Sequence, residues 1–363
     1  MTTTRFRFSL PLLLVLLVAA GIAGLAQAPK QKSAKSKSTA SMPVLPPLPK
    51  TGMLKNAKAA TSFTFIVLGD NRPAKQTPTQ PVITGQLISD MKQYNPEFVL
   101  WTGDVIAGKD PKAKLIQQEY EKFLELAKTA GVPVFDVPGN HEMNAAENAP
   151  CLAMEKLYRK HMVKELYGAF AYGNSRFIGL DTDSLQKTAN CKPPTKNYDN
   201  KGYVDKQQLE SLDAYLKANA DADYIFIFMH RPMFPKSGGV GLNAASTAKL
   251  EKIFKKYKNI AYVMAAHEHL YYNALNKDNS PPPCLPSKAQ RPFYLVSGGA
   301  GAPLSGDKDE GEEEEKGEFD PDAFYNYLVF EVAPGTVKVT LVNCGTDPTQ
   351  AQCKAQPACA AMP

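Results

Sequence analysis

The chain has 363 residues, enough for one large domain or two ordinary ones, and carries 42 basic and 36 acidic side chains, a net charge of +6. Residues 1–59 contain no Asp or Glu and nine of the basic residues, which leaves 33 basic and 36 acidic residues in 60–363, a net charge of −3. The body of the chain is therefore not basic, and a nucleic-acid-binding surface is not indicated.

The N-terminus has the pattern of a targeting segment. Arg5 and Arg7 precede an apolar stretch from Leu10 to Leu25, and Ala26-Gln27-Ala28 forms a small-x-small cleavage signal. We predict a signal peptide over residues 1–28 and a secreted or periplasmic protein. The alternative is an uncleaved membrane anchor, because the stretch approaches the roughly 20 residues that span a bilayer. In that case this segment would be the membrane contact of the protein.

Residues 29–60 are rich in Lys, Ser and Pro and are predicted to form a disordered linker, because such a composition buries too little apolar surface to fold. Apolar runs then alternate with helical patterns. The runs predict strands at 63–68, 98–102, 132–137, 224–229 and 260–265, and the patterns between them predict helices at 82–94, 112–129, 205–217 and 245–257. This alternation is typical of βαβ units and predicts an α/β protein with a partly parallel sheet.

The second half of the chain is richer in predicted strands, at 176–181, 293–297, 325–332 and 337–342. The turn signal Pro334-Gly335 joins the last two strands into a hairpin. We therefore predict one α/β domain over residues 61–343, in which a second mixed sheet packs against the first. An acidic loop at 307–322 and a Cys-containing tail at 344–363 complete the predicted organisation.

Six cysteines are spread over the chain without a Cys-x-x-Cys pair: Cys151, Cys191, Cys284, Cys344, Cys353 and Cys359. An even number of cysteines in an exported chain predicts disulfides, and fifteen pairings of six cysteines are open.

Carboxylates, an amide and imidazoles follow the predicted strands directly. The motifs are Asp70-Asn71-Arg72, Gly103-Asp104, Gly139-Asn140-His141-Glu142, His230-Arg231-Pro232 and His267-Glu268-His269. In open parallel sheets, ligands bind beyond the carboxyl ends of the strands. These side chains are the ligands of hard or borderline metal ions, so the motifs predict a metallohydrolase.

In order and spacing, the five motifs resemble those of the calcineurin-like metallophosphoesterases, the family that includes purple acid phosphatases and many bacterial phosphodiesterases. The resemblance covers residues 62–300 and includes the loop Gly298-Gly299-Ala300-Gly301. It implies a four-layer αββα sandwich and a metal-dependent phosphoric ester hydrolase, a phosphatase or phosphodiesterase. The implied substrate is a small-molecule or polymeric phosphate ester.

The resemblance also implies two divalent or trivalent ions of iron, manganese or zinc. By similarity Asp104 bridges them, with Asp70 and His269 on the first ion and Asn140, His230 and His267 on the second. A metal-bridging water or hydroxide then attacks phosphorus. His141 is not a ligand in this comparison, and it faces the substrate and assists the leaving group.

Two positions depart from the family pattern. Arg72 stands where a histidine is common, and a guanidinium cannot bind a metal ion because it stays protonated. The first metal site is therefore weakened, and one bound ion instead of two is the alternative. Arg72 is a candidate either for binding a substrate phosphate or for pairing with Asp70 and Asp104. Ala266, where glycine is usual, changes the backbone only locally.

Two other classes of protein compete with this one. A zinc peptidase would need His-Glu-x-x-His, which neither His141-Glu142 nor His267-Glu268 begins. A non-catalytic relative that binds a ligand or a partner, with Arg72 marking a degraded first metal site, remains the alternative. For Arg231, a phosphate contact and a structural ion pair are both open.

Overall fold

The computed structural model describes the chain in segments: residues 60–108, 113–143, 152–183, 201–237, 240–282, 290–305 and 323–357, together with Leu54, Cys284, Leu285, Lys288 and Asp320. The predicted signal peptide, nearly all of the predicted linker and nearly all of the acidic loop lie outside these residues. Within the described segments, no helix is long and apolar enough to cross a membrane.

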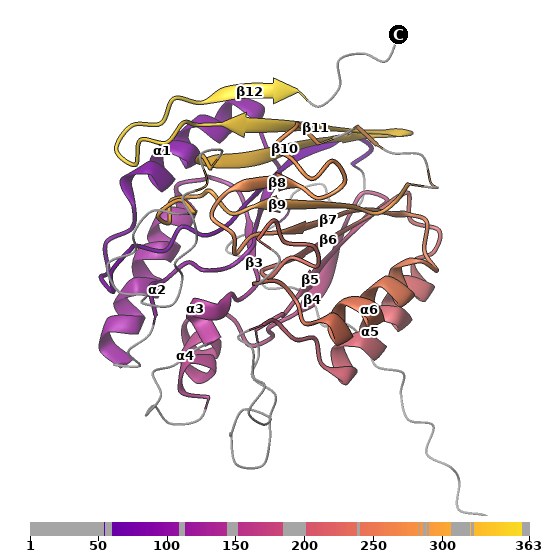
Figure 1. The fold of residues 1–363 in the computed structure, drawn as a ribbon, viewed down its shortest axis with the longest axis horizontal. Helices are drawn as coiled ribbons and strands as arrows, with labels where there is room; N and C mark the ends of the chain where they lie inside the picture. The colour runs from indigo at the N-terminus through magenta and orange to yellow at the C-terminus, as the bar shows by residue number, and fades with distance from the viewer. Residues whose placement is uncertain are drawn as a thin grey trace, which may run out of the picture. The chain divides into compact units, whose positions relative to one another are not determined.

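Two six-stranded mixed sheets stand at the centre of the described part of the chain (Figure 1). The first has the order β12 (Lys354–Pro357), β11 (Thr336–Asn343), β10 (Asn326–Ala333), β1 (Phe63–Leu68), β2 (Phe98–Trp101) and β3 (Val134–Asp136). The second has the order β4 (Gly168–Tyr172), β5 (Ser175–Leu180), β6 (Tyr224–Met229), β7 (Ile260–Ala265), β9 (Phe293–Ser297) and β8 (Tyr271–Asn273). Strands β1, β2 and β3 are parallel, as are β5, β6, β7 and β9, and the other pairings are antiparallel. The predicted α/β class with two mixed sheets is confirmed.

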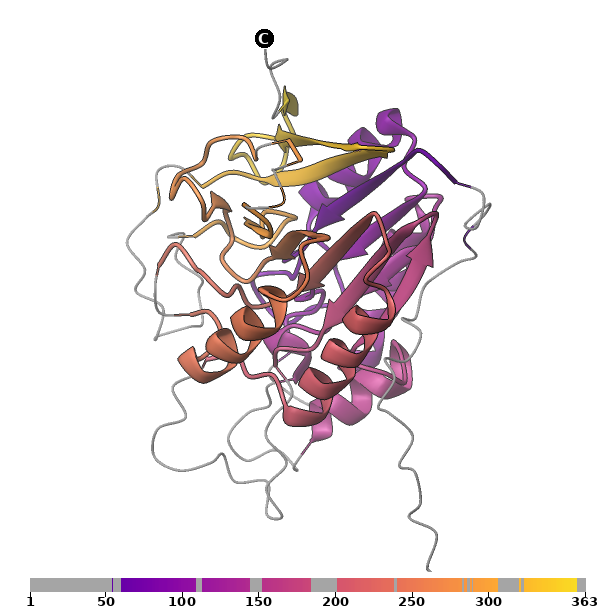
Figure 2. The ribbon, with the colours of Figure 1, turned by 90° about the vertical axis from the view of Figure 1, so that its right-hand side faces the viewer.

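Helices cover the outer face of each sheet. Those on the first sheet are α1 (Val82–Met91) with its 3-10 extension η1 (Lys92–Tyr94), α2 (Ala113–Lys128) and α4 (Ala153–His161), whose apolar side chains share one cluster with the sheet. Those on the second sheet are α5 (Lys206–Ala218) and α6 (Ala244–Phe254), and Figure 2 shows them in front of that sheet. Helix α3 (Asn140–Met143) is a single turn. The order helix, sheet, sheet, helix confirms the predicted four-layer sandwich.

Strand β1 shows why the core forms between the sheets. Side chains alternate across a strand, so Phe65 and Val67 enter the cluster between the sheets, whereas Ile66 and Leu68 pack on the helix side. Phe65 meets Phe226 of β6 edge to face, with ring centroids 5.0 Å apart. A strand that is buried on both faces appears in sequence as a continuous apolar run, and its polar residues begin where the run ends.

Helix α5 begins at Asp205, whose carboxylate accepts the Gln208 N–H at 2.7 Å. The return bond of a capping box is not made. The Gln208 amide turns instead to Asp181, donating to its carbonyl at 2.9 Å and accepting its N–H at 2.8 Å. Gln208 therefore fastens α5 to the chain that leaves β5.

A disulfide pins the C-terminal tail to the first sheet. Cys344 is bonded to Cys353, and strand β12 then pairs antiparallel with β11. Cys284 is also disulfide-bonded, and no described cysteine is free. The predicted disulfides are thus confirmed for these three cysteines, while Cys151, Cys191 and Cys359 lie outside the described residues.

Candidate metal centre

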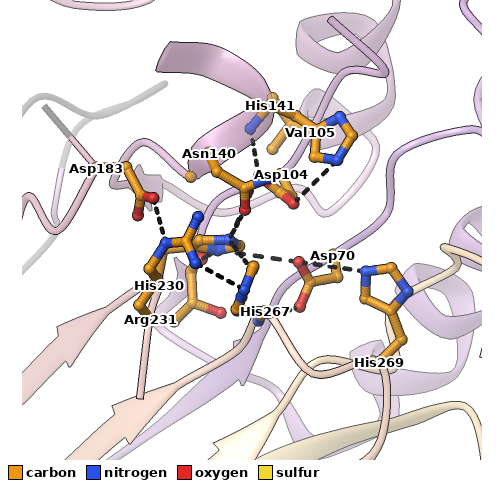
Figure 3. A network of polar contacts seen from close by, with 12 residues as sticks. Asp70, Asp104, Val105, Asn140, His141, Asp183, His230, Arg231, His267 and His269 are labelled. Atoms are coloured by element: carbon orange, nitrogen blue, oxygen red, sulfur yellow. Dashed lines mark hydrogen bonds and ion pairs between the residues drawn. The ribbon is translucent and has the colours of Figure 1, made fainter. Parts of the chain in front are cut away.

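The carboxyl ends of parallel strands from both sheets meet at one place (Figure 3). Side chains from one sheet bond the backbone of the other. The Asp70 carboxylate, after β1, accepts the His267 N–H at 2.6 Å, and His230, after β6, donates from Nδ1 to the Thr102 carbonyl at 2.8 Å. The motifs that are dispersed in the sequence therefore form one buried cluster.

Three of the predicted ligands have backbone conformations that L-residues rarely adopt. Asp70, Asp104 and His267 have φ angles of 61°, 54° and 72°. Such conformations cost on the order of 1–3 kcal/mol each and occur mainly at functional sites, where the surrounding structure enforces them. Glycine is required nearby: a Cβ on Gly139 would lie 2.1 Å from Asp104 Oδ1. The backbone at this centre is shaped to bring carboxylates together.

The predicted second metal site is a convergence of four donor atoms. His230 Nε2 lies 2.9 Å from Asn140 Oδ1, 3.1 Å from His267 Nδ1 and 3.4 Å from Asp104 Oδ1. Because a carbonyl can only accept, the bond to Thr102 fixes the His230 proton on Nδ1 and leaves a lone pair on Nε2. Two oxygen and two nitrogen donors at such spacing match the ligand types of zinc and similar ions.

The predicted first metal site consists of Asp70, Asp104 and His269, whose ligand atoms lie within 4.8 Å of one another. His269 donates from Nδ1 to the Pro303 carbonyl at 2.6 Å, which leaves Nε2 as the ligand atom, 3.9 Å from Asp70 Oδ1. Asp70 Oδ1 is buried and has no hydrogen-bond partner among the described residues. A buried carboxylate oxygen that accepts no hydrogen bond lowers the free energy of unfolding by about 1–3 kcal/mol or more. A bound cation would interact with this oxygen and offset that loss.

Asp104 belongs to both groups of candidate ligands, Asp104 with His230 and His267, and Asp104 with Asp70 and His269. This is the arrangement that a bridging carboxylate needs. The donor set and the unsatisfied Asp70 oxygen together fit a pair of metal ions.

Burial controls the electrostatics of the cluster. It raises the pKa of Asp70 well above the ordinary value, with the neighbouring Asp104 adding to the rise and Arg72 opposing it. Burial also raises the pKa of Asp104, against the lowering effects of His230 and Arg72. For His267, burial and the adjacent Arg231 hold the pKa well below 6.5, so the ring is neutral. The neutral His267 imidazole lies beside closely spaced carboxylates, an arrangement that is ready to bind a cation.

Glu142 holds the two loops that carry the ligands. Its buried carboxylate accepts the N–H groups of Gly139 at 2.7 Å, Asp104 at 2.9 Å, Val105 at 2.9 Å and Ile106 at 3.3 Å. The loop after β2 is thereby tied to the loop after β3. The motif contains Glu142, but its sequence position alone did not indicate this role.

Arg231 is part of a buried ion pair. Its Nε lies 2.5 Å from Asp183 Oδ1, its Nη1 donates to the Val240 carbonyl at 2.9 Å, and the same Nη1 lies 3.0 Å from His267 Nε2. Of the two roles open for Arg231, the structure favours the ion pair, and through it the ring of His267 is oriented. Asp183 follows β5 in a segment without a motif, so no sequence pattern indicates its role.

The two remaining predicted site residues lie beside the cluster. His141 donates its backbone N–H to Asp104 Oδ1 at 3.0 Å, and its Nε2 lies 3.9 Å from Asp104 Oδ2. The two groups of candidate ligands consist of Asp70, Asp104, His230, His267 and His269, and His141 lies beside them. Arg72 is 3% exposed, and its charge lowers the pKa of both aspartates. Its contact with a substrate phosphate stays a prediction.

Trp101 and Tyr271, two aromatic residues close to the motifs in the sequence, are both fully buried. Trp101 donates from its indole to Asn71 Oδ1 at 2.8 Å, which holds the chain next to Asp70 in place. Both aromatic residues are therefore structural.

Two groups of buried donors that share one carboxylate define a candidate dinuclear metal centre of the kind used by metallohydrolases. A family model described as calcineurin-like phosphoesterase matches residues 63–271, and the chain belongs to that family. The resemblance drawn from the motifs is thereby confirmed. A search of curated proteins found no match.

Solved structures share the fold at low sequence identity. A purple acid phosphatase from yellow lupin (Lupinus luteus) seeds superposes with a TM-score of 0.55 and 16% identity over 82% of this chain and 53% of that one. A dimetal phosphatase from Danio rerio gives 0.53 and 13%, over 82% and 99% of the two chains. GAP50, described as the anchor in the inner membrane complex of Plasmodium, gives 0.51 and 14%, over 82% and 89%. The chain spans about half the length of the lupin enzyme, and these likenesses establish the fold alone.

Asp136, at the end of β3 and behind the metal cluster, generates a prediction on stability. Burial raises its pKa from 3.8 to about 8, although its carboxylate accepts the Tyr158 hydroxyl at 2.8 Å. The folded state therefore keeps a proton that the unfolded state releases, and stability decreases as pH rises from about 4 to about 8. Asp136→Asn keeps an acceptor for Tyr158 and removes this titration.

We expect urea unfolding of the chelator-treated protein to show a loss of several kcal/mol for the wild type between pH 5 and pH 8, at up to about 1.4 kcal/mol per pH unit from Asp136. The loss should be clearly smaller in Asp136→Asn. The control is Asp213→Asn, because hydrogen bonds from Lys256 and Tyr257 lower the pKa of Asp213 against its partial burial and place its titration below this range. Equal pH slopes for wild type and Asp136→Asn would show that Asp136 is ionised in the fold.

Proposed function

We propose that this chain is a metal-dependent phosphoesterase that hydrolyses phosphate monoesters or diesters. The observation that carries the proposal is Asp104, which joins two groups of buried nitrogen and oxygen donors into one centre. Membership of the calcineurin-like phosphoesterase family supports a phosphate ester as the substrate. Iron, manganese and zinc all suit the donor set.

When bound, two metal ions supply an activated water and neutralise the charge that develops on the phosphoryl oxygens. Asp70, Asp104 and His269 would hold one ion, and Asn140, His230 and His267 with Asp104 the other. His141 would serve the leaving group. Its Nδ1 bonds the Ala107 carbonyl at 2.6 Å, so Nε2 is the atom that faces the centre and carries the transferable proton in the imidazolium form.

The alternative is a protein that keeps the fold and binds without catalysis. Arg72 motivates it, because the first site lacks a histidine there, and GAP50 is a protein of this fold that is described as an anchor. The buried donors around Asp104 favour metal binding under both readings. Measured hydrolysis of phosphate esters distinguishes the enzyme from the non-catalytic binding protein.

We also propose that the chain is exported after cleavage within residues 26–28. The disulfide between Cys344 and Cys353 and the bonded Cys284 support an oxidising compartment. N-terminal sequencing of the mature protein tests this proposal. A start between residues 27 and 29 is expected, and an intact N-terminal hydrophobic stretch would indicate the membrane anchor instead.

Asp104→Ala tests the function directly. We expect wild-type protein to carry about two metal ions and to hydrolyse p-nitrophenyl phosphate or bis(p-nitrophenyl) phosphate. Because Asp104 serves both sites, the variant should lose most of its metal and at least ~10³-fold in kcat/KM. Metal is measured by elemental analysis and folding by circular dichroism, with the partly exposed Asp213→Ala as the control. Equal rates and equal metal contents in wild type and Asp104→Ala would contradict the proposal.

Arg72→His tests the unusual residue. If Arg72 binds the substrate phosphate, as we propose, replacing it by a metal-binding imidazole raises metal affinity at the first site yet raises KM by roughly tenfold or more, about 1.4 kcal/mol. Arg72→Lys keeps the positive charge but lacks the planar guanidinium that can donate two parallel hydrogen bonds. Its KM should therefore lie between those of the wild type and Arg72→His. Tighter metal binding together with an unchanged or lower KM would show that Arg72 contributes nothing to substrate binding.

A further inference from the structure

Glu119 lies on α2, outside every motif, and its carboxylate is buried behind the candidate centre. Its Oε1 accepts the Ala107 N–H at 3.1 Å, and the Gly108 N–H also donates to the carboxylate. Gln76 donates to Oε2 at 3.3 Å. A buried acid that receives consecutive backbone N–H groups fixes the end of the loop that begins at Asp104.

The same stretch of backbone holds His141 from the opposite side. The Ala107 carbonyl accepts Nδ1–H of His141 at 2.6 Å. That carbonyl and the Gly108 N–H belong to one peptide group, so the Glu119 carboxylate and the His141 imidazole lie at its two ends. In its ionised form Glu119 places negative charge at the N–H end, which polarises the peptide and makes its carbonyl a stronger acceptor.

Packing leaves this loop little freedom. Gly108 has a φ of 66°, and a Cβ placed on it would lie 2.2 Å from the His141 carbonyl oxygen. Glu142 holds the beginning of the loop at Val105 and Ile106, and Glu119 holds its end. The position of the Ala107 carbonyl, which accepts the His141 hydrogen bond, is therefore set by two buried glutamates, Glu142 and Glu119. Only Glu142 belongs to a motif.

We propose that Glu119 is a positioning residue for His141, acting through the peptide group between Ala107 and Gly108. It keeps Nδ1 of His141 as a hydrogen-bond donor to Ala107 and so keeps Nε2 directed at Asp104. The consequence for leaving-group chemistry rests on the proposed function. The geometry of the ring does not rest on it.

Two variants separate charge from hydrogen bonding. Glu119→Gln removes the charge but keeps an oxygen that can accept the N–H groups of Ala107 and Gly108. Glu119→Ala removes both the charge and the hydrogen-bond acceptor. Burial raises the pKa of Glu119 to about 7, so a neutral side chain at this place is compatible with the fold. The control is Glu121→Ala, an exposed acid on the same helix that bonds Gln117 at 2.6 Å.

The ring geometry is tested by NMR on chelator-treated protein with ¹⁵N-labelled histidine. We expect a slowly exchanging Nδ1–H signal that is absent from His141→Ala, shifted in Glu119→Gln and lost to exchange in Glu119→Ala. Glu121→Ala should leave it unchanged. An unaltered signal in Glu119→Ala would overturn the proposal whether or not the protein is an enzyme.

The chemical consequence is tested by comparing an alkyl phosphate with p-nitrophenyl phosphate, which needs little help from an acid. Glu119→Ala should lower kcat at least tenfold on the alkyl ester and much less on the aryl ester, with metal content and KM unchanged. In a His141→Ala background the Glu119 effect should disappear. Additive losses, or equal losses on both esters, would overturn the proposal. Wild-type protein that hydrolyses neither monoester nor bis(p-nitrophenyl) phosphate, with the NMR effect intact, would refute the proposed function and leave the positioning of His141 standing.

Discussion

The structure depends on the burial of the Asp104 carboxylate between two sheets. Only 1% of this residue is exposed, and its backbone has a φ of 54° that an aspartate adopts at a cost. Its N–H is held by Glu142, its Oδ1 accepts the His141 N–H, and the same oxygen lies 3.4 Å from His230 Nε2. A buried carboxylate next to a second one, Asp70, is unfavourable unless positive charge lies between them. A pair of metal ions held by the candidate donors would supply that charge.

The sandwich explains how such a cluster forms from segments nearly 200 residues apart. Parallel strands of both sheets end at the same place, and the aromatic core around Phe65 and Phe226 fixes the sheets against each other. Bonds between the sheets, from His230 to Thr102 and from His267 to Asp70, then join the two strand ends directly. Ligands on rigid strand ends, held by buried glutamates, give a centre whose geometry is fixed before any metal binds.

The sequence predicted most of this arrangement for identifiable reasons. Strands such as β1 and β6 are buried on both faces, so they appear as apolar runs, and the polar residues after them stand out. Short strands such as β8 and β12 were not predicted, because three or four residues carry little periodicity. Glu119 and Asp183 were missed for a different reason. Each acts on a backbone or side-chain partner distant in sequence, and a single acid without a motif looks like any surface carboxylate. Gln208 likewise bonds Asp181 instead of closing a capping box, because a tertiary contact was available.

The most direct test of the dinuclear centre is electron paramagnetic resonance of the metal-free protein titrated with Mn²⁺. If Asp104 bridges two ions, two equivalents should give an exchange-coupled spectrum that Asp104→Ala abolishes. A signal of isolated Mn²⁺ at every stoichiometry, the same in wild type and Asp104→Ala, would show that this carboxylate does not join two metal sites.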